Sequence, residues 1–236
     1  NASSAQSVQI TAAQDPDLEN ESGTISLTSP SVPVDFPSET VYVNISDNDI
    51  QSIVANQQSL SVTEGTTGNL GISLAFQPVS NVTISIQSAN PGVASINPAQ
   101  LVFTPSNYGN MQNIVVTGVQ DNNVIPGNTS ISLSAAGLAP LSVAVSVPED
   151  DVQAIILSTN LINMNEAATD SFTLRLAYEP ASNVMVNLSS TLPGQLQTSL
   201  TRVFFTPANY DQARSVNLNA PRDNTMQDHT AQVRVN

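Results

Sequence analysis

Residues 101–108, LVFTPSNY, recur as VFFTPANY at residues 203–210, an offset of 102 residues. The same offset places QPVSNV at 77–82 on EPASNV at 179–184 without a gap. A repeat of this length is the size of an independent domain, because solenoid repeats have only about 20–50 residues. The chain is therefore expected to be a tandem array of one type of domain.

The repeats divide the chain into three copies that differ in completeness. At an offset of 106, residues 1–27 match residues 107–133, so the first copy starts part-way through a repeat. We expect residues 1–49 to form the C-terminal half of a repeat. Residues 50–151 would form a complete repeat, and residues 152–236 a repeat without its last strand. This frame favours a piece of a longer tandem chain. The alternative is a filament subunit whose open edges are filled by strands of neighbouring subunits.

Apolar and polar residues alternate through most of the complete repeat. Leu70, Ile72 and Leu74 are separated by small residues, and Val143, Val145 and Val147 show the same period of two. Such alternation is typical of antiparallel strands with one buried face. Seven strands in about 100 residues indicate an all-β fold of tandem immunoglobulin-like antiparallel β-sandwiches. The predicted strands lie near residues 59–63, 69–76, 81–88, 100–104, 112–119, 129–135 and 141–147. Thr104-Pro105 and Thr206-Pro207 predict a single helical turn.

The composition excludes several classes of function. Only 10% of the residues are charged, against about 25% in average proteins, and the net charge is −14. Nucleic acids and anionic membranes are not expected partners, because both need clustered basic residues. No apolar run is long enough to cross a membrane. The chain has no cysteine and one histidine, His229, which leaves no material for thiolate zinc sites or cysteine nucleophiles.

Acidic residues converge on one pole of the predicted sandwich. Successive strands run in opposite directions, so the first, fifth and seventh strands end at the same pole. Glu64 follows the first strand, Asp121 the fifth, and Asp150 and Asp151 the seventh. Carboxylates held together in this way suit calcium, which takes 6–8 oxygen ligands. The other interpretation is that they are solvated turn residues. The corresponding candidates are Asp15, Asp17, Asp47 and Asp49 in the first copy and Glu166 and Asp223 in the third.

At this point the chain resembles Calx-β domains. The resemblance rests on SVTEG at 61–65, GVQDNN at 118–123 and the acidic linkers SDND at 46–49 and PEDD at 148–151. Residues 96–122 are also similar to Calx-β-like repeats of large bacterial surface proteins. The resemblance implies an extracellular or cell-surface array used for adhesion or as a stalk. It also implies calcium at the domain ends, with Glu64, Asp121, Asp150 and Asp151 as ligands in the complete copy.

We therefore expect a non-enzymatic, extracellular structural array, with calcium-stiffened joints between the domains. The sequence contains no phosphate-binding loop, no Ser–His–Asp order and no HExxH motif. The expected partners are neighbouring repeats of the same chain or other copies of the protein. One alternative is the filament subunit joined by strand exchange. A glycan- or protein-binding module is the third hypothesis. It is less favoured because the chain has no tryptophan to stack on sugars.

Overall fold

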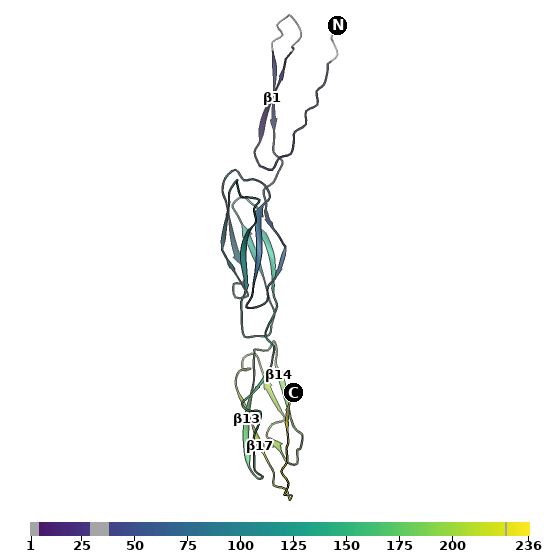
Figure 1. Ribbon diagram of the computed structural model, residues 1–236, viewed down its shortest axis with the longest axis vertical. Helices are drawn as coiled ribbons and strands as arrows, with labels where there is room; N and C mark the ends of the chain where they lie inside the picture. Colours follow the sequence, from purple (N-terminus) through teal and green to yellow (C-terminus); the bar gives the residue numbers. More distant parts are fainter. Residues whose placement is uncertain (1–4, 29–37, 225) are drawn as a thin grey trace. The chain divides into compact units, whose positions relative to one another are not determined.

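The protein is an all-β molecule, as the alternation predicts (Figure 1). The computed structural model describes residues 5–28, 38–224 and 226–236, and every regular element in these ranges is a strand. The chain divides into two compact units. The first contains Asn1–Val62, Thr67–Thr117 and Asn128–Val145; the second contains Thr63–Thr66, Gly118–Gly127 and Ser146–Asn236. Loops that follow strands of the complete repeat thus belong to the second unit.

The complete repeat contains nine strands in two sheets, two more than the seven predicted. One sheet has the order β3-β5-β9-β7 and the other β4-β11-β10-β6-β8. Neither β3 nor β7, the two edge strands of the first of these sheets, was predicted. The strands are β3 (Ile53–Ala55), β4 (Ser59–Ser61), β5 (Thr67–Leu74), β6 (Val82–Ser88), β7 (Ala94–Asn97), β8 (Gln100–Phe103), β9 (Gln112–Gly118), β10 (Gly127–Ser134) and β11 (Leu141–Val147).

Alternate residues of these strands fill the space between the two sheets. Ile84, Ile114, Leu133 and Val143 are completely buried, and Phe103 on β8 is also completely buried. The residues between them face outward, as the pattern of β9 shows most regularly. Because the apolar residues have a period of two, one face of each sheet becomes the core.

The third copy repeats this arrangement strand by strand, and we call residues 102 positions apart counterparts. Its first sheet, β12-β13-β17-β15, corresponds to the whole of β3-β5-β9-β7. Its second sheet, β16-β14-β18, corresponds to β8-β6-β10. The described residues contain no strand at 161–163, the place of β4. The strands are β12 (Ile155–Leu157), β13 (Thr169–Leu176), β14 (Val184–Ser190), β15 (Gln197–Thr198), β16 (Arg202–Phe205), β17 (Arg214–Asn219) and β18 (Val233–Val235).

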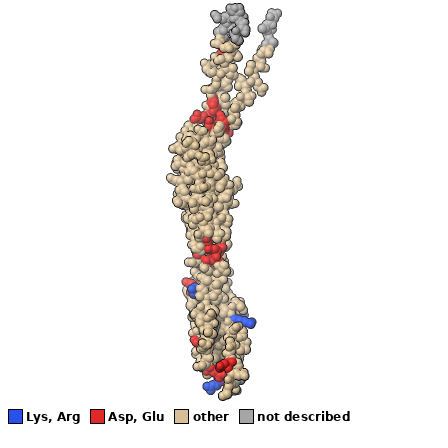
Figure 2. Space-filling view, viewed as in Figure 1, with Lys and Arg blue, Asp and Glu red and all other residues tan. Residues whose placement is uncertain are grey.

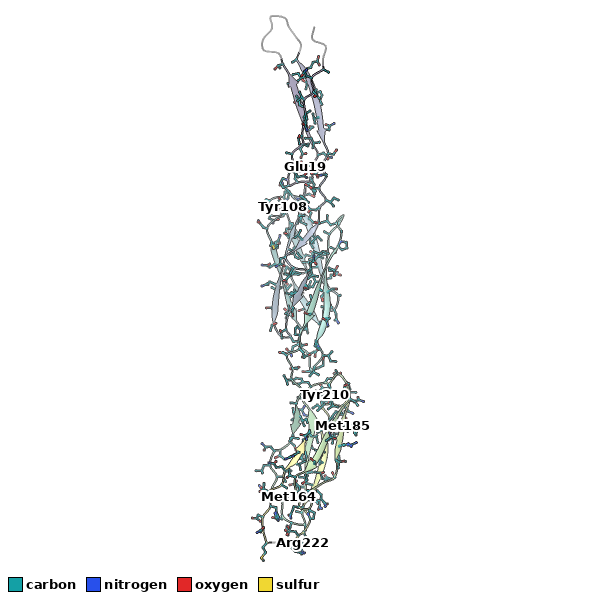
Figure 3. All side chains as sticks on the ribbon, turned by 90° about the vertical axis from the view of Figure 1, so that its right-hand side faces the viewer. Glu19, Tyr108, Met164, Met185, Tyr210 and Arg222 are labelled. Atoms are coloured by element: carbon teal, nitrogen blue, oxygen red, sulfur yellow. The ribbon has the colours of Figure 1, made fainter. Side chains whose placement is uncertain are left out.

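Backbone hydrogen bonds agree with this correspondence. The Leu74 N–H donates to the carbonyl of Tyr108 at 2.9 Å, and the Leu176 N–H donates to that of Tyr210 at the same distance. Figure 3 marks both tyrosines. They end the TPxNY segments, where Asn107 accepts from the Thr104 N–H at 2.6 Å. The segment forms a hydrogen-bonded turn where a helical turn was predicted, because the asparagine side chain closes it locally.

The described part of the first copy is a two-stranded ribbon. β1 (Glu21–Leu27) pairs antiparallel with β2 (Glu39–Ile45). No residue of either strand is buried, and Leu27 and Val41 are 53% and 46% exposed. Among the described residues, no second sheet covers this ribbon as one does in the complete repeat.

One position of the repeat takes a left-handed backbone conformation. It is occupied by Gly65 (φ 65°) in the complete copy and by Ala167 (φ 60°) in the third. This conformation costs a non-glycine residue about 1–2 kcal/mol. Glycine avoids this cost, but it loses more conformational entropy on folding, which offsets part of the gain. We expect Ala167→Gly to raise the free energy of unfolding by about 0.5–1 kcal/mol, measured by denaturant titration.

The reverse substitution is the matched control. Gly65→Ala should lower the free energy of unfolding by about 1–2 kcal/mol. Its Cβ would also lie only 2.9 Å from Oε1 of Gln120. If Ala167→Gly destabilised the protein, backbone strain at this position would be excluded.

Candidate metal centre

Three separate parts of the chain meet around Glu64, which comes three residues after β4. The Glu64 N–H donates to the carbonyl of Pro148 at 3.2 Å, and Glu64 forms a parallel bridge with Gly118. A side chain at 118 would place its Cβ 2.7 Å from the carbonyl oxygen of Thr63, so glycine allows this close approach. The segment after β4, the end of β9 and the segment after β11 are thereby held together, as strand direction predicted.

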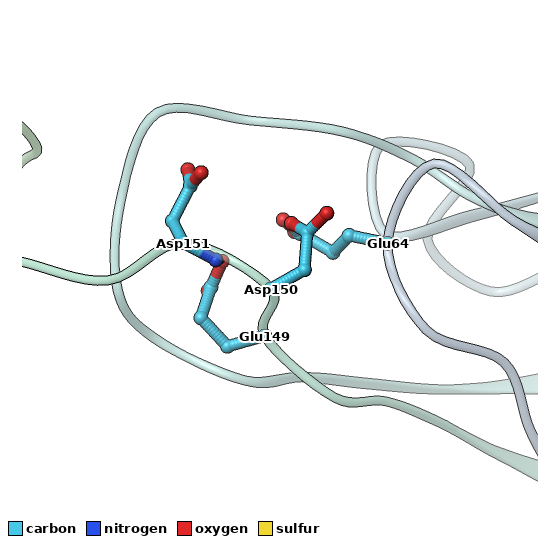
Figure 4. A group of neighbouring side chains, drawn as sticks. All are labelled: Glu64, Glu149, Asp150 and Asp151. Atoms are coloured by element: carbon cyan, nitrogen blue, oxygen red, sulfur yellow. The ribbon is translucent and has the colours of Figure 1, made fainter.

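This convergence assembles four carboxylates, which we call the acidic centre: Glu64, Glu149, Asp150 and Asp151. One carboxylate oxygen from each lies within 4.8 Å of those from the others (Figure 4). Glu64 is only 3% exposed. Figure 2 shows acidic atoms gathered in patches with wide uncharged surface between them. Such a concentration of negative charge needs a compensating group.

Neighbouring side chains donate hydrogen bonds to only some of the carboxylate oxygens in the acidic centre. The Gln120 amide donates to Oε2 of Glu64 at 3.3 Å and to Oδ1 of Asp150 at 3.1 Å. Oε2 of Glu149 and Oδ2 of Asp151 are buried without a hydrogen-bond partner among the described residues. Buried oxygens of this kind are costly unless a donor or a cation reaches them.

Burial and charge repulsion raise the pKa of Glu64. Burial, a hydrogen bond with the Glu149 carboxyl group and the negative charges of Asp121, Glu149 and Asp150 raise the pKa of Glu64 to about 7. The pKa of Tyr178 is raised by its hydrogen bond to Asp151 and by the charge of that carboxylate. Glu64 therefore loses its proton only near neutral pH.

The acidic centre also touches the third copy, within the second unit. The Glu179 N–H donates to the carbonyl of Asn122 at 2.8 Å. The Val124 N–H donates to the carbonyl of Glu179 at 3.2 Å. The loop after β9 is thus hydrogen-bonded to the turn between β13 and β14.

A second acidic group lies in the first unit. Asp15, Asp17 and Asp47 each place a carboxylate oxygen within 4.8 Å of the others. Gln14 donates to both carboxylate oxygens of Asp49 at 3.3 Å, and it aligns with Gln120 at the offset of 106. Partial desolvation and the negative charges of Asp15 and Asp17 raise the pKa of Glu21.

The predicted ligands are not all brought together. Asp49 lies outside the group of Asp15, Asp17 and Asp47, and its N–H donates to Asp47 at 2.5 Å. The negative charge of Asp121 raises the pKa of Glu64. The Oδ1 atom of Asp121, however, accepts a hydrogen bond from the Asn123 N–H at 2.8 Å. Glu149 was not predicted, although it lies in the same acidic linker as Asp150 and Asp151.

In the third copy, the two predicted ligands are Glu166 and Asp223. Neither belongs to a group of clustered carboxylates among the described residues. Glu166 is exposed, whereas its counterpart Glu64 is buried. Asp223 lies 3.3 Å from Nε2 of His229. The segment that follows β11 covers Glu64, and the described residues give Glu166 no equivalent cover.

The chemistry of the acidic centre fits calcium. Oxygens bound to one calcium ion at about 2.3–2.6 Å lie within about 5 Å of one another, which matches the spacing of at most 4.8 Å. All the ligand atoms would be hard carboxylate oxygens, and the two unpartnered oxygens would gain a cation. Magnesium fits less well, because it demands near-octahedral geometry and keeps several waters.

The raised pKa of Glu64 predicts how stability depends on pH without metal. The folded protein holds this proton up to about pH 7, whereas the unfolded chain releases it near the ordinary value of 4.5. The free energy of unfolding, measured with a chelator present, should therefore fall as pH rises from about 4.5 to 7. Glu64→Gln should remove this fall and raise the free energy of unfolding at pH 8 by up to about 3 kcal/mol, since one pKa unit is about 1.36 kcal/mol.

The counterpart provides the control for this prediction. Glu166→Gln changes the same residue type at the same repeat position, where the side chain is exposed. Its pH profile should follow that of the unchanged protein. A Glu64→Gln profile that also matched the unchanged protein would contradict the raised pKa.

Comparison with known proteins gives remote structural similarity only. The sequence matches no protein-family model and no curated protein. Domains 4 and 5 of the S-layer protein SbsC are 18% identical with a TM-score of 0.34, over 47% of this chain and 59% of that one. Domains 4–9 of SbsC are 13% identical with a TM-score of 0.38, over 90% and 33%. The YadV chaperone is 11% identical with a TM-score of 0.32, over 78% and 92%.

The first of these matches has a clear limit of coverage. The chain spans about three fifths of the length of the SbsC fragment with domains 4 and 5. Among the described residues, no helix has the length and apolarity needed to cross a membrane.

Proposed function

We propose that the protein is a non-enzymatic, extracellular structural array of β-sandwich repeats, with calcium bound at the acidic centre. The observation that carries this proposal is the meeting of four carboxylates, two of which keep buried oxygens without a partner. The Calx-β resemblance and the similarity to a surface-layer protein support the same role. Adhesion or a stalk is the use that the resemblance implies.

Calcium would act mechanically. The ion would join the segment after β4, through Glu64, to the linker residues Glu149, Asp150 and Asp151. Tyr178 contacts Asp151, and the loop after β9 pairs with Glu179, so the same ion would fix the linker against the third copy. Without calcium, repulsion among the carboxylates would loosen these segments.

Spin labels in the two units test this role. The chain has no cysteine, so Thr83→Cys on β6 and Asn187→Cys on β14 give two exposed labelling sites. We expect calcium to narrow the distribution of distances between the labels, and magnesium to leave it broad. Pulsed electron resonance measures this width directly.

Two further variants separate the acidic centre from general charge effects. Asp150→Asn should abolish the narrowing, because it removes a ligand. Asp170→Asn, an exposed acid on β13 outside both acidic groups, should leave it intact. Equal widths with calcium and with chelator would contradict calcium stiffening at this joint.

A further inference from the structure

A glutamine that follows the acidic linker binds the backbone of the third copy. Gln153 lies two residues after Asp151, and both it and its partner Tyr178 belong to the second unit. The Gln153 amide donates to the carbonyl of Tyr178 at 2.7 Å, and its Oε1 accepts from the Tyr178 N–H at 3.2 Å. Oε1 also accepts from the Ala154 N–H at 3.1 Å. We call these three hydrogen bonds, all to main-chain groups, the glutamine clamp.

The first unit contains the same clamp one repeat earlier. Gln51, the counterpart of Gln153, donates to the carbonyl of Phe76 at 2.7 Å. Its Oε1 accepts from the Phe76 N–H at 3.2 Å and from the Ser52 N–H at 3.0 Å. The counterparts of Phe76 and Ser52 are a tyrosine and an alanine, but the clamp uses only main-chain groups at these positions. The glutamine is therefore the one side chain that the clamp requires.

The residue after the clamped one is bound by the preceding repeat. The Glu179 N–H donates to the carbonyl of Asn122 at 2.8 Å. In the first unit the Gln77 N–H donates to the carbonyl of Pro16 at 2.9 Å. Gln77 is the counterpart of Glu179, and Pro16 aligns with Asn122 at the offset of 106. The turns after β5 and β13 are thus each held from two sides, by a linker glutamine and by the loop of the preceding copy.

The segment between the acidic centre and β12 has few other attachments. Val152, which separates Asp151 from Gln153, is 80% exposed. The carbonyl of Ala154, the last residue before β12, accepts from the Ala177 N–H at 2.9 Å. Valine and alanine have no polar side chain, so Gln153 alone can hold this segment through side-chain hydrogen bonds.

We propose that Gln153 is the positioning residue through which calcium stiffens the joint. Calcium would fix the linker residues Glu149, Asp150 and Asp151 against the complete repeat, and the clamp fixes the linker against the third copy. Only Val152 lies between these two attachments. Without the clamp the ion would still bind, but it would hold one side of the joint only. This inference rests on the proposed function and deepens it by naming the residue that carries its mechanical effect.

Gln153→Met separates calcium binding from stiffening, because methionine has a similar length but no amide. In the protein labelled through Thr83→Cys and Asn187→Cys, the distance distribution should stay broad when calcium is added. Calorimetric titration should show an unchanged calcium affinity, since Gln153 is not a member of the acidic centre. A residue needed only for folding would lose both properties together.

The counterpart glutamine is the matched control. Gln51→Met breaks the same clamp in the first unit. It should therefore leave intact the calcium-dependent narrowing between the labels at 83 and 187. Narrowing that persists in Gln153→Met, or a calcium affinity that is lost with this variant, would overturn the proposal.

Hydrogen exchange followed by NMR tests the clamp without metal. With chelator present, Gln153→Met should speed exchange of the Tyr178 N–H by about fivefold to tenfold, because this amide loses its acceptor. Protection of β13 and β17 should not change, which would show that the third copy stays folded. Gln51→Met should speed exchange of the Phe76 N–H and leave that of Tyr178 unchanged. Equal Tyr178 exchange in Gln153→Met and the unchanged protein would contradict the clamp.

The two proposals fail separately in these experiments. If the unchanged protein binds no calcium, the calcium centre and its coupling to stiffness are contradicted. Faster Tyr178 exchange in Gln153→Met would then still support the clamp as a metal-independent attachment of the linker. Calcium binding with narrowing that does not need Gln153 would leave the acidic centre intact and contradict its role as the positioning residue.

Discussion

Calcium at about one hundred times its dissociation constant is expected to raise the free energy of unfolding by about 2.7 kcal/mol. The reason is that the folded protein gathers Glu64, Glu149, Asp150 and Asp151 within 4.8 Å, an arrangement that the unfolded chain cannot hold. The ion would replace repulsion among these carboxylates with attraction. Denaturant titration with calcium, with magnesium and with chelator at constant ionic strength measures the effect.

Substitutions at one repeat position serve as controls for the calcium effect. Glu64→Gln should remove most of the calcium-dependent stabilisation, since it neutralises the most buried ligand. Glu166→Gln should retain it, because Glu166 is exposed and belongs to no acidic group in the described chain. The same stabilisation by magnesium, or none by calcium, would contradict the proposed centre.

Phe205→Ala is expected to lower the free energy of unfolding of the third copy by about 3–5 kcal/mol. Phe205 is completely buried and belongs to the core of that sandwich with Phe172, Leu174 and Val216. Removing the ring deletes apolar contacts and leaves a cavity that the two sheets cannot close. Hydrogen exchange followed by mass spectrometry locates the loss of protection along the chain.

Neighbouring residues provide a close control for this prediction. Phe204 precedes Phe205 on β16 but is 60% exposed, so Phe204→Ala should change stability by no more than about 0.5 kcal/mol. Phe103→Ala, at the counterpart position, should destabilise the complete repeat by a similar 3–5 kcal/mol. Equal effects of Phe204→Ala and Phe205→Ala would contradict the alternation on which the fold depends.

Alternation in the sequence predicted the fold because burial enforces a period of two. The seven predicted strands all exist, from β4 to β11. In the complete repeat only β3 and β7, the edge strands of one sheet, were not predicted. Because the sequence repeats at an offset of 102 residues, the same pattern predicts the corresponding strands of the third copy.

The acidic centre was predictable only in part. Strand direction correctly placed Glu64, Asp150 and Asp151 at one pole, because chain direction alternates through the sandwich. It could not decide which residues of the acidic linker join the group, and so Glu149 was left out of the predicted ligands. Nor could it show that Asp121 turns back to the Asn123 N–H, since loop conformation depends on local hydrogen bonds.

Glu166 is exposed in the described residues, whereas its counterpart Glu64 is buried. Glu64 and Glu166 occupy the same repeat position, but only Glu64 has an acidic linker beside it in the described structure. The sequence repeat fixes where this glutamate lies in the fold. The neighbouring segment determines how deeply the glutamate is buried and which charges surround it.

Calorimetric titration of the metal-free protein with calcium at pH 8 tests the central claim most directly. We predict saturable binding that Glu64→Gln or Asp150→Asn weakens by about tenfold or more and that Glu166→Gln leaves unchanged. Extracellular calcium modules bind with dissociation constants of about 10⁻⁴–10⁻³ M, so the titration should reach millimolar calcium. Absence of saturable binding in that range, or equal binding by all three variants, would contradict the calcium centre.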